Sequence, residues 1–483
     1  MPKSATRDDA RMHERPAPMF HGALVGLCLC ILLSSLGTSI ANVALPSLAS
    51  VFSASFEQVQ WIVLAYLLAM TTLVVSTGRL GDIIGRRRLL LAGLFLFTAA
   101  SACCAMAPTF ALLVAARAVQ GLGAAIMAAL GMAMVGEAVS RERTGSAMGL
   151  LGTMSAVGTA LGPSLGGFLI SALGWRSIFL VNIPLSVLAF CLAGRFLPAD
   201  GDKSQHVRSR FDSLGTLLLA ATLASYALAM TTGRSASGWI GTGLVLATLI
   251  GGGLFLLVEA RVRSPLIQLA AFRSEGLSVN LATSALVATV MMTTFVVGPF
   301  YLARVLALDE AVIGVVMAVG PVISIASGVF AGRIVDRLGA PRLILVGLAE
   351  MALGAIVLSA AGPAFGVAGY LAGIAVLTPG YQLFQAANNT AVMASVPADR
   401  RGVTSGLITL SRNLGLITGA SAMGAVFHLA AGTGDIAKAA AQAVFFGMQA
   451  TFGTAALLMV AAIILAAGTR VAAGRAGQAQ DSP

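Results

Sequence analysis

Long apolar runs alternate with short polar stretches along almost the whole chain. Windows of about 18 or more apolar residues recur, whereas a membrane β-barrel shows short segments of alternating hydrophobicity. Fourteen runs can be delimited, at residues 20–45, 56–77, 89–107, 109–137, 145–172, 176–197, 212–232, 238–258, 276–302, 311–330, 343–360, 364–394, 402–428 and 444–468. The pattern therefore predicts an all-α membrane protein with 14 transmembrane helices.

Composition supports this prediction. Of the 483 residues, 58% are hydrophobic and only 10% are charged, whereas soluble domains carry about 25% charged residues. The first apolar run is too long for a cleavable signal peptide and is expected to remain as the first helix. The five cysteines all fall inside predicted helices, with neither metal-ligand spacing nor a disulfide framework.

The positive charges indicate how the chain crosses the membrane. A net charge of +11 would suggest nucleic-acid binding in a soluble protein, but here the basic residues gather in alternate loops. With a cytoplasmic N-terminus, all but six of the 30 Lys and Arg lie on the cytoplasmic side, the six being Arg117, Arg176, Arg234, Arg304, Arg412 and Lys438. This bias predicts a multi-pass protein of the lipid bilayer with both termini cytoplasmic and no nucleic-acid partner.

Two motifs occur twice at nearly the same distance. The charged turn GRLGDIIGRRR (78–88) returns as GRIVDRLGAPR (332–342), 254 residues later, and RTGSAMGL (143–150) returns as RRGVTSGL (400–407), 257 residues later. Two halves of one topology, related by an axis along the membrane normal, explain both repeats.

The offset also predicts the domain organisation. Six helices per half would give about 200 residues, so the excess of about 55 corresponds to an inserted helix pair. The expected parts are a cytoplasmic tail at 1–19, a six-helix bundle at 20–197, a linker with the inserted helices at 198–275, a second six-helix bundle at 276–468 and a cytoplasmic tail at 469–483.

Further segments carry a family resemblance. They are WIVLAYLLA (61–69), RAVQGLGAA (117–125), GTALGPSLGG (158–167) and GWRSIFLVNIP (174–184). With the charged turn, in which Ile83 replaces a usual basic residue, they resemble the major facilitator superfamily. More narrowly, they resemble its fourteen-helix drug:proton antiporters.

The resemblance implies a function as well as a fold. It implies secondary active export of drugs or other amphipathic small molecules in exchange for protons, by alternating access at a bacterial-type inner membrane. Accessory efflux proteins are further candidate partners.

The first helix departs from the family pattern. The family reads L-D-x-T-I-x-N-V-A-L-P where this chain reads LGTSIANVALP (36–46), so that Gly37 replaces a membrane-embedded aspartate. The usual proton carrier is therefore missing. Two other functions stay open: a dedicated exporter of one metabolite or siderophore, and a transporter-like sensor that binds ligands without moving them.

The charged turn corresponds to the family's gating loop. A carboxylate at Asp82 is favourable near the start of the following helix, and it lies four residues from Arg86, with which it can pair on a helical turn. The alternative is a loop that only fixes the topology. The residues assigned to this role are Gly78, Arg79, Asp82, Gly85, Arg86, Arg88, Asp336 and Arg337.

The segment 158–167 corresponds to the family's antiporter motif, for which the resemblance implies a seal on the outer side. Its small-xxx-small steps let a neighbouring helix approach closely, and helix packing alone is the alternative. The motif residues are Gly158, Gly162, Pro163, Gly166 and Gly167.

Pro163 removes a backbone hydrogen bond and should bend its helix. The second half aligns Gly415 and Gly419 with the first two glycines but has Ala420 at the proline position. We therefore expect the bend in the first half only.

Charged residues inside predicted helices are candidates for proton coupling. Arg117 lies about nine residues into its helix, where a charge costs about 2.5–3.5 kcal/mol on insertion scales. Glu350 is the carboxylate placed well inside a predicted helix, and a buried glutamate can exchange a proton near neutral pH. The alternatives are an arginine satisfied by backbone carbonyls and a glutamate that only hydrogen-bonds.

Polar side chains in the first, fourth and twelfth runs predict the substrate cavity, because helices 1 and 4 and their repeat mates line it in this fold. Hydrogen bonding between helices is the alternative. The candidates are Ser35, Thr38, Asn42, Tyr66, Gln385, Asn388, Asn389 and Arg412.

Other chemistry finds no support in the sequence. There is no Walker motif for ATP-driven transport, and the four histidines are scattered. No nucleophile–base arrangement stands out. We therefore expect neither an enzyme, nor a cofactor, nor a bound metal.

Overall fold

Helices make up the fold. The computed structural model describes residues 17–138, 144–200, 212–232, 238–262, 275–394, 401–432, 436 and 439–480, and no strand occurs among them. Thirteen helical stretches in this part of the chain are long and apolar enough to cross a membrane. In addition, a shorter apolar stretch, Val157–Leu173, falls where the fifth helix was predicted. The predicted all-helical membrane fold is confirmed, while the count of 14 stays a prediction.

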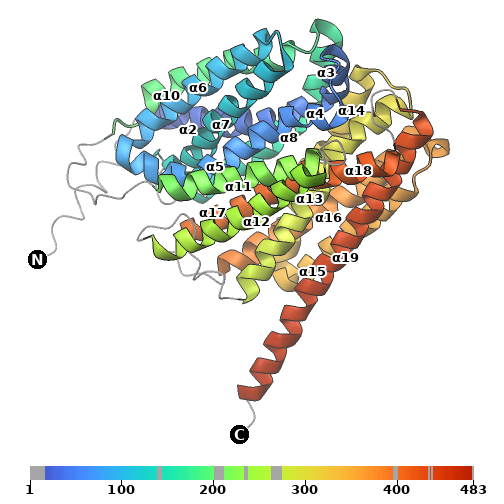
Figure 1. Ribbon diagram of the computed structural model, residues 1–483. Coiled ribbons are helices and arrows are strands. Elements are labelled where there is room, and N and C mark those ends of the chain that lie inside the picture. Colours follow the sequence, from blue (N-terminus) through green and yellow to red (C-terminus); the bar gives the residue numbers. More distant parts are fainter. Residues whose placement is uncertain are drawn as a thin grey trace, which may run out of the picture.

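The first half forms one bundle, coloured blue to green in Figure 1. It comprises α2 (Ala17–Val43), α3 (Leu45–Val51), α4 (Phe56–Val59), α5 (Trp61–Ile84), α6 (Arg86–Met106), α7 (Phe110–Ala138), α8 (Thr144–Leu173), α9 (Ser177–Leu180) and α10 (Asn182–Phe196). The short helices α3, α4 and α9 lie between the long ones.

The second half forms the other bundle, coloured yellow to red. It comprises α13 (Glu275–Arg304), α14 (Glu310–Leu338), α15 (Ala340–Ala360), η4 (Pro363–Phe365), α16 (Gly366–Ala394), α17 (Arg401–Thr418), η6 (Gly419–Met423), α18 (Gly424–Ala431) and α19 (Ala441–Gln480). Because α19 is helical as far as Gln480, it continues into the segment predicted as a C-terminal tail. Of the predicted N-terminal tail, residues 1–16 lie outside the described part.

The internal repeat is visible in the local geometry. Gly85 ends α5 with φ of 104° and Gly339 ends α14 with φ of 83°, a left-handed conformation that glycine adopts without strain. In each half the next long helix, α6 or α15, starts directly afterwards. The two charged turns therefore share one backbone conformation.

Helix contacts repeat in the same way. In the first half, Ser39 Oγ of α2 donates to the carbonyl of Gly158 in α8 over 3.3 Å. In the second, Thr289 Oγ1 of α13 donates to the carbonyl of Gly415 in α17 over 3.1 Å. In each half, the acceptor is the carbonyl of a glycine at which two helices approach closely. These two glycines, Gly158 and Gly415, are the ones that the repeat aligns.

The expectation of a one-sided bend needs correction. α8 contains Pro163, while the second half has a π-helical segment, η6, that begins at Gly419 and includes Ala420. A π turn interrupts the regular hydrogen-bond ladder as a proline does. Both halves are thus distorted at corresponding positions, by different means.

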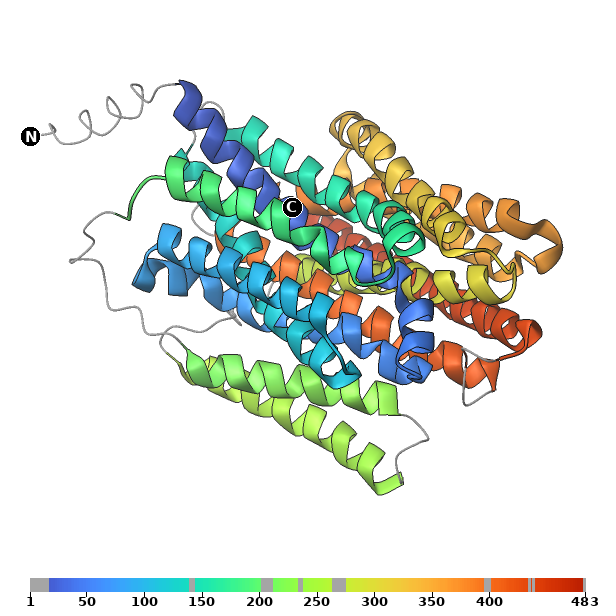
Figure 2. The ribbon, with the colours of Figure 1, turned by 90° about the horizontal axis from the view of Figure 1, so that it is seen from above.

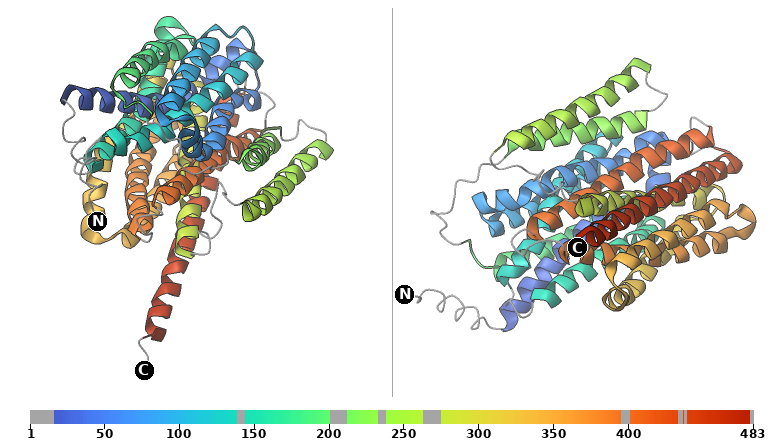
Figure 3. Two further views of the ribbon diagram at one scale, coloured as in Figure 1. Left: turned by 90° about the vertical axis from the view of Figure 1, so that its left-hand side faces the viewer. Right: turned by 90° about the horizontal axis from the view of Figure 1, so that it is seen from below.

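The inserted pair, α11 (Ser213–Thr232) and α12 (Gly238–Arg261), lies along one side of the bundles (Figures 2 and 3). α11 touches both halves, through Ser76 and Thr216 hydroxyls 2.9 Å apart and through Tyr226, which donates to Thr418 over 3.2 Å. α12 packs on α11 and leaves most of its apolar surface exposed, including Trp239. The pair therefore covers a seam between the halves.

Candidate transport cavity

A cavity of about 440 Å³ lies between the two bundles. The first half contributes side chains of α2, α5 and α8, and the second half those of α13, α14, α16 and α17. This is the place where a molecule can contact both halves at once.

Most of the predicted cavity residues line this space: Ser35, Thr38, Asn42, Gln385, Asn389 and Arg412. Two do not. Tyr66 is fully buried, and its hydroxyl donates to the Ser34 carbonyl over 2.8 Å. Asn388 is also fully buried, one position from a lining residue but on another face of α16. Polarity alone could not distinguish these faces, because α16 carries polar residues at successive positions.

Apolar lining residues were missed by sequence reasoning. Met291, Met292 and Phe295 of α13 and Met317 of α14 form part of the wall. Apolar residues occur on every face of these helices, so periodicity does not show which face meets the cavity. Flexible methionines and an aromatic ring suit the apolar part of an amphipathic ligand.

Several polar atoms at the cavity have no partner among the described residues. Asn42 Oδ1 on α2, and Asn413 Nδ2 and Arg412 Nε on α17, are buried without a hydrogen bond. Asn42 and Asn413 are only 1% and 2% exposed. A buried polar group without a hydrogen bond is costly, so these three atoms are the buried polar groups of the described wall that still lack a partner.

Arg117 on α7 lies outside the cavity, in a closed cage. It donates from Nε to the Ile62 carbonyl (2.9 Å), from Nη1 to Gln120 Oε1 (2.6 Å) and from Nη2 to the Gly37 carbonyl (3.0 Å). Its guanidinium also stacks over the Tyr66 ring, 4.3 Å from the centroid. This geometry matches the alternative stated for Arg117, an arginine satisfied by carbonyls.

Position 37 shows why the cage contains no carboxylate. A Cβ atom at Gly37 would lie 2.8 Å from the Tyr66 hydroxyl and 3.2 Å from its Cζ. The tyrosine therefore occupies the space that an aspartate side chain would need.

Glu350 lies on α15, half-buried against α16, where it approaches the backbone of Gly380. It is not among the described residues that line the cavity.

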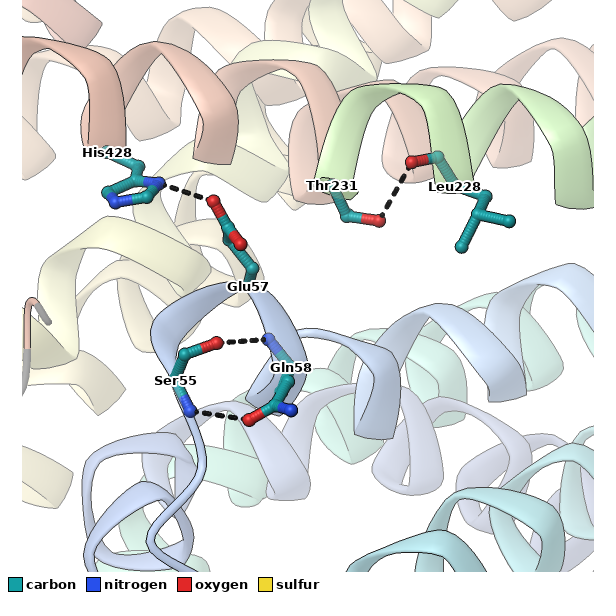
Figure 4. A network of polar contacts seen from close by, with 6 residues as sticks. All are labelled: Ser55, Glu57, Gln58, Leu228, Thr231 and His428. Carbon is teal, nitrogen blue, oxygen red and sulfur yellow. Dashed lines mark hydrogen bonds and ion pairs between the residues drawn. The ribbon is translucent and has the colours of Figure 1, made fainter. Parts of the chain in front are cut away.

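The bundles meet at one end of the cavity. Phe56 of α4 packs against Phe300 and Phe427 of the second half, with ring centroids 4.9 and 5.2 Å apart. Beside it, Glu57 Oε1 lies 2.7 Å from His428 Nδ1, and Figure 4 shows this contact crossing between the bundles. Ser55 and Gln58 form a capping box at the N-terminus of α4, in which the side chain of each accepts a hydrogen bond from the backbone N–H of the other.

The glycines of α8 have two neighbours. Gly158, Gly162 and Gly166 face α2, where a Cβ atom on Gly162 would approach Ile40 N to 2.9 Å. Gly167 instead faces α14 of the other bundle, where its own Cβ would lie 2.6 Å from the Cα of Gly314. The motif thus joins helices inside the first bundle and also brings the two bundles into backbone contact.

The first charged turn is held by a carboxylate that sequence reasoning missed. Asp200, after α10, accepts hydrogen bonds from the backbone N–H groups of Arg87 (3.0 Å) and Arg88 (3.1 Å) at the start of α6. The position near the N-terminus of α6 predicted for Asp82 is therefore occupied by Asp200.

Other residues of the turns are placed as follows. Arg86 is half-buried, and Gly78, Arg88, Asp336 and Arg337 are exposed. The side chains of Arg79 and Asp82, and with them the predicted pair with Arg86, lie outside the described part.

Comparison with known proteins decides the family. The sequence profile of the Major Facilitator Superfamily matches residues 27–420. The chain belongs to the Major Facilitator Superfamily. It is therefore a multi-pass membrane transporter of small molecules and not an enzyme, as predicted.

Similar members of the superfamily come from bacteria. The riboflavin transporter RibZ of Clostridioides difficile is 30% identical over 409 residues, which cover 84% of this chain and 87% of RibZ. The multidrug resistance protein Stp of Mycobacterium tuberculosis is 31% identical over 409 residues, covering 83% and 75%. Relatives thus carry names both of single-metabolite and of multidrug transporters.

A solved structure supports the fold. A bacterial homologue of the human lysosomal transporter Spinster, in an inward-facing and unoccupied conformation, matches with a TM-score of 0.66 at 14% identity, covering 94% of this chain and 97% of that one. The superfamily fold also explains why one cavity lies between two similar bundles.

Proposed function

We propose that this transporter exports amphipathic small molecules, drugs among them, by alternating access in exchange for protons. The observation that carries the proposal is the cavity between the bundles, with methionine and phenylalanine on its wall and unpaired amides beside them. An amphipathic ligand offers both kinds of contact. The multidrug transporters among the relatives support the same substrate class.

The contacts at the Phe56 end support alternating access. If the charge bias places both termini in the cytoplasm of a bacterial inner membrane, this end faces outward. The aromatic cluster and the Gly167–Gly314 contact then form an outer seal, which the family resemblance assigns to the antiporter motif. The charged turns lie at the opposite ends of α5 and α14, where a gating role would act on the other opening.

Proton coupling is assigned to Glu350, with Arg117 as a residue that shapes the bundle interior. Glu350 is a half-buried carboxylate inside the spanning helix α15, at its contact with α16, and position 37 offers none. This assignment requires that protonation of Glu350 alters the packing of α15 on α16, because the side chain does not reach the cavity.

A second candidate is the export of one metabolite. The similarity to RibZ, a riboflavin transporter, favours it, because that relative matches over most of both chains. A cavity with fixed amide partners also suits a narrow range of ligands better than an all-apolar one.

The test uses everted membrane vesicles with an imposed pH gradient and a pH-sensitive dye. A panel of neutral, cationic and anionic drugs, with riboflavin, is added to wild-type vesicles and to vesicles with Glu350→Gln. Proton release on addition of several unrelated compounds is expected, with loss of release in Glu350→Gln.

Each other result has a distinct meaning. Response to one compound alone supports the metabolite exporter. Unchanged release in Glu350→Gln removes Glu350 as the carrier. Binding of compounds without any proton release or flux would contradict transport and favour a sensor.

A further inference from the structure

One charged side chain stands at the cavity. Among the described residues of its wall, Arg412 is the only one with a formal charge, and none is an aspartate or glutamate. A cavity built for lipophilic cations would need a carboxylate or a cage of aromatic rings to balance the ligand's charge. The described wall has the rings of Phe295, Tyr370 and Tyr381 but no carboxylate, and its one formal charge, on Arg412, is positive.

The two arginines inside the membrane differ in their partners. Arg117 makes three hydrogen bonds and a ring contact and is fully buried. Arg412 is half-buried, and its Nε is enclosed without a hydrogen-bond partner among the described residues. A membrane-embedded charge is costly unless it is paired or meets water. The contacts of Arg117 offset this cost, whereas the described residues offer no such set of partners to Arg412.

Neighbouring groups complete the site. Asn413, next to Arg412 on α17, also lines the cavity, and its Nδ2 has no hydrogen-bond partner among the described residues. Arg412 and Asn413 together present donors, which match an anion with two oxygen atoms. Met291 and Phe295 supply the apolar wall for the rest of the ligand.

We propose that the cavity selects amphipathic anions, molecules with a ring system and a carboxylate or similar oxyanion, and that Arg412 binds the anionic group. The inference rests on the proposed function, in which this cavity holds the transported molecule. It specifies the charge of the substrate, which the proposed function leaves open.

The experiment measures binding of two dyes that share a xanthene ring but differ in charge, the anion fluorescein and the cation rhodamine 123. The full chain is reconstituted in nanodiscs of a zwitterionic lipid, and dye binding is measured by fluorescence anisotropy at neutral pH. Wild type is compared with Arg412→Gln and Arg412→Lys. Arg304→Gln serves as the control, because it removes the same charge from an exposed site at the end of α13.

The expected result is tighter binding of fluorescein than of rhodamine 123 by wild type. Arg412→Gln should weaken fluorescein binding by about tenfold or more, the loss expected for a charge-assisted hydrogen bond. It should leave rhodamine 123 binding equal or stronger. Arg412→Lys should retain part of the affinity, since it keeps the charge but not the planar fork, and Arg304→Gln should match wild type.

Three results would overturn the inference: tighter binding of the cation by wild type, an equal loss of both dyes in Arg412→Gln, or no change in that variant. Dye uptake into proteoliposomes under a pH gradient distinguishes failure of the anion proposal from failure of the proposed transport function. Charge-selective binding without uptake would sink the transport proposal alone. Uptake of rhodamine 123 without Arg412 dependence would sink the anion proposal alone.

Discussion

At position 37, one absent side chain determines what surrounds Arg117. Tyr66 fills the space beside Gly37, stacks on the guanidinium and bonds to the Ser34 carbonyl. The carbonyl of Gly37 then takes the hydrogen bond that a carboxylate could otherwise accept. The charge of Arg117 is thus compensated by backbone and side-chain dipoles and by a ring face, and no carboxylate takes part in the cage.

Restoring the family's aspartate should therefore destabilise this protein. In Gly37→Asp, the new Cβ would lie 2.8 Å from the Tyr66 hydroxyl, and we expect a loss of about 1–3 kcal/mol from overpacking. Adding Tyr66→Phe removes the closest atom and should recover part of the loss. Thermal unfolding of the two single variants and the double variant in detergent measures the coupling between the positions.

Additive effects of the two substitutions would contradict this account, as would Gly37→Asp with wild-type stability. Gly37→Ala is the matched control: it introduces the same Cβ atom without a charge and should show the steric part of the loss.

At the scale of elements, the start of α6 depends on a residue far away in the sequence. Asp200 accepts two backbone hydrogen bonds there, and a Cβ atom on Gly85 would lie 2.6 Å from its Cγ. The glycine of the charged turn is thus required both by its positive φ and by the carboxylate that caps the next helix.

We predict that Asp200→Ala lowers the stability of the protein by about 1 kcal/mol, the usual loss for an N-terminal helix cap. Hydrogen exchange should speed up at the amides of Arg87 and Arg88, which lose their acceptor. The control is Asp336→Ala, which removes an exposed carboxylate from the second charged turn. Equal exchange rates in both variants would show that Asp200 does not hold the helix start.

Elements differ in how far the sequence predicts them. Long apolar runs predicted the helices, because membrane helices satisfy their own backbone within one segment. Asp200 and the π turn at Gly419 could not be predicted, since each depends on packing between segments distant in the chain. Both arginines were found in the membrane, but only the contacts show that Arg117 is enclosed and that Arg412 lines the cavity.

At the scale of the molecule, the bundles are joined at one end by small and aromatic contacts. A Cβ atom on Gly314 would lie 2.7 Å from the Pro163 carbonyl and 2.8 Å from the Cα of Gly167. One turn earlier on α14, Glu310 accepts a hydrogen bond from Ser47 over 3.0 Å. Because these contacts cross between bundles, they stabilise the state closed at this end without being needed inside either bundle.

Gly314→Ala should therefore favour opening at the Phe56 end while leaving each bundle folded. The added methyl group would separate α8 from α14, and a ligand-free equilibrium between two states responds to a few kcal/mol. The measurement is the distance distribution between spin labels at the exposed positions Ser50 and Leu429, by pulsed electron resonance, in a chain whose native cysteines are replaced by serine. A longer distance should gain population in Gly314→Ala.

Gly328→Ala is the matched control for this shift. Gly328 also lies inside α14, but its Cβ atom would approach its nearest neighbour, Gln382 Oε1, only to an ordinary 3.5 Å. Both substitutions remove a helix-interior glycine and gain similar helix propensity, so a general stiffening of α14 would act equally in the two variants. A shift confined to Gly314→Ala would show that the Gly167–Gly314 contact helps to keep this end closed. Equal distributions in both variants would show that the aromatic cluster and the Glu57–His428 pair suffice to keep it closed.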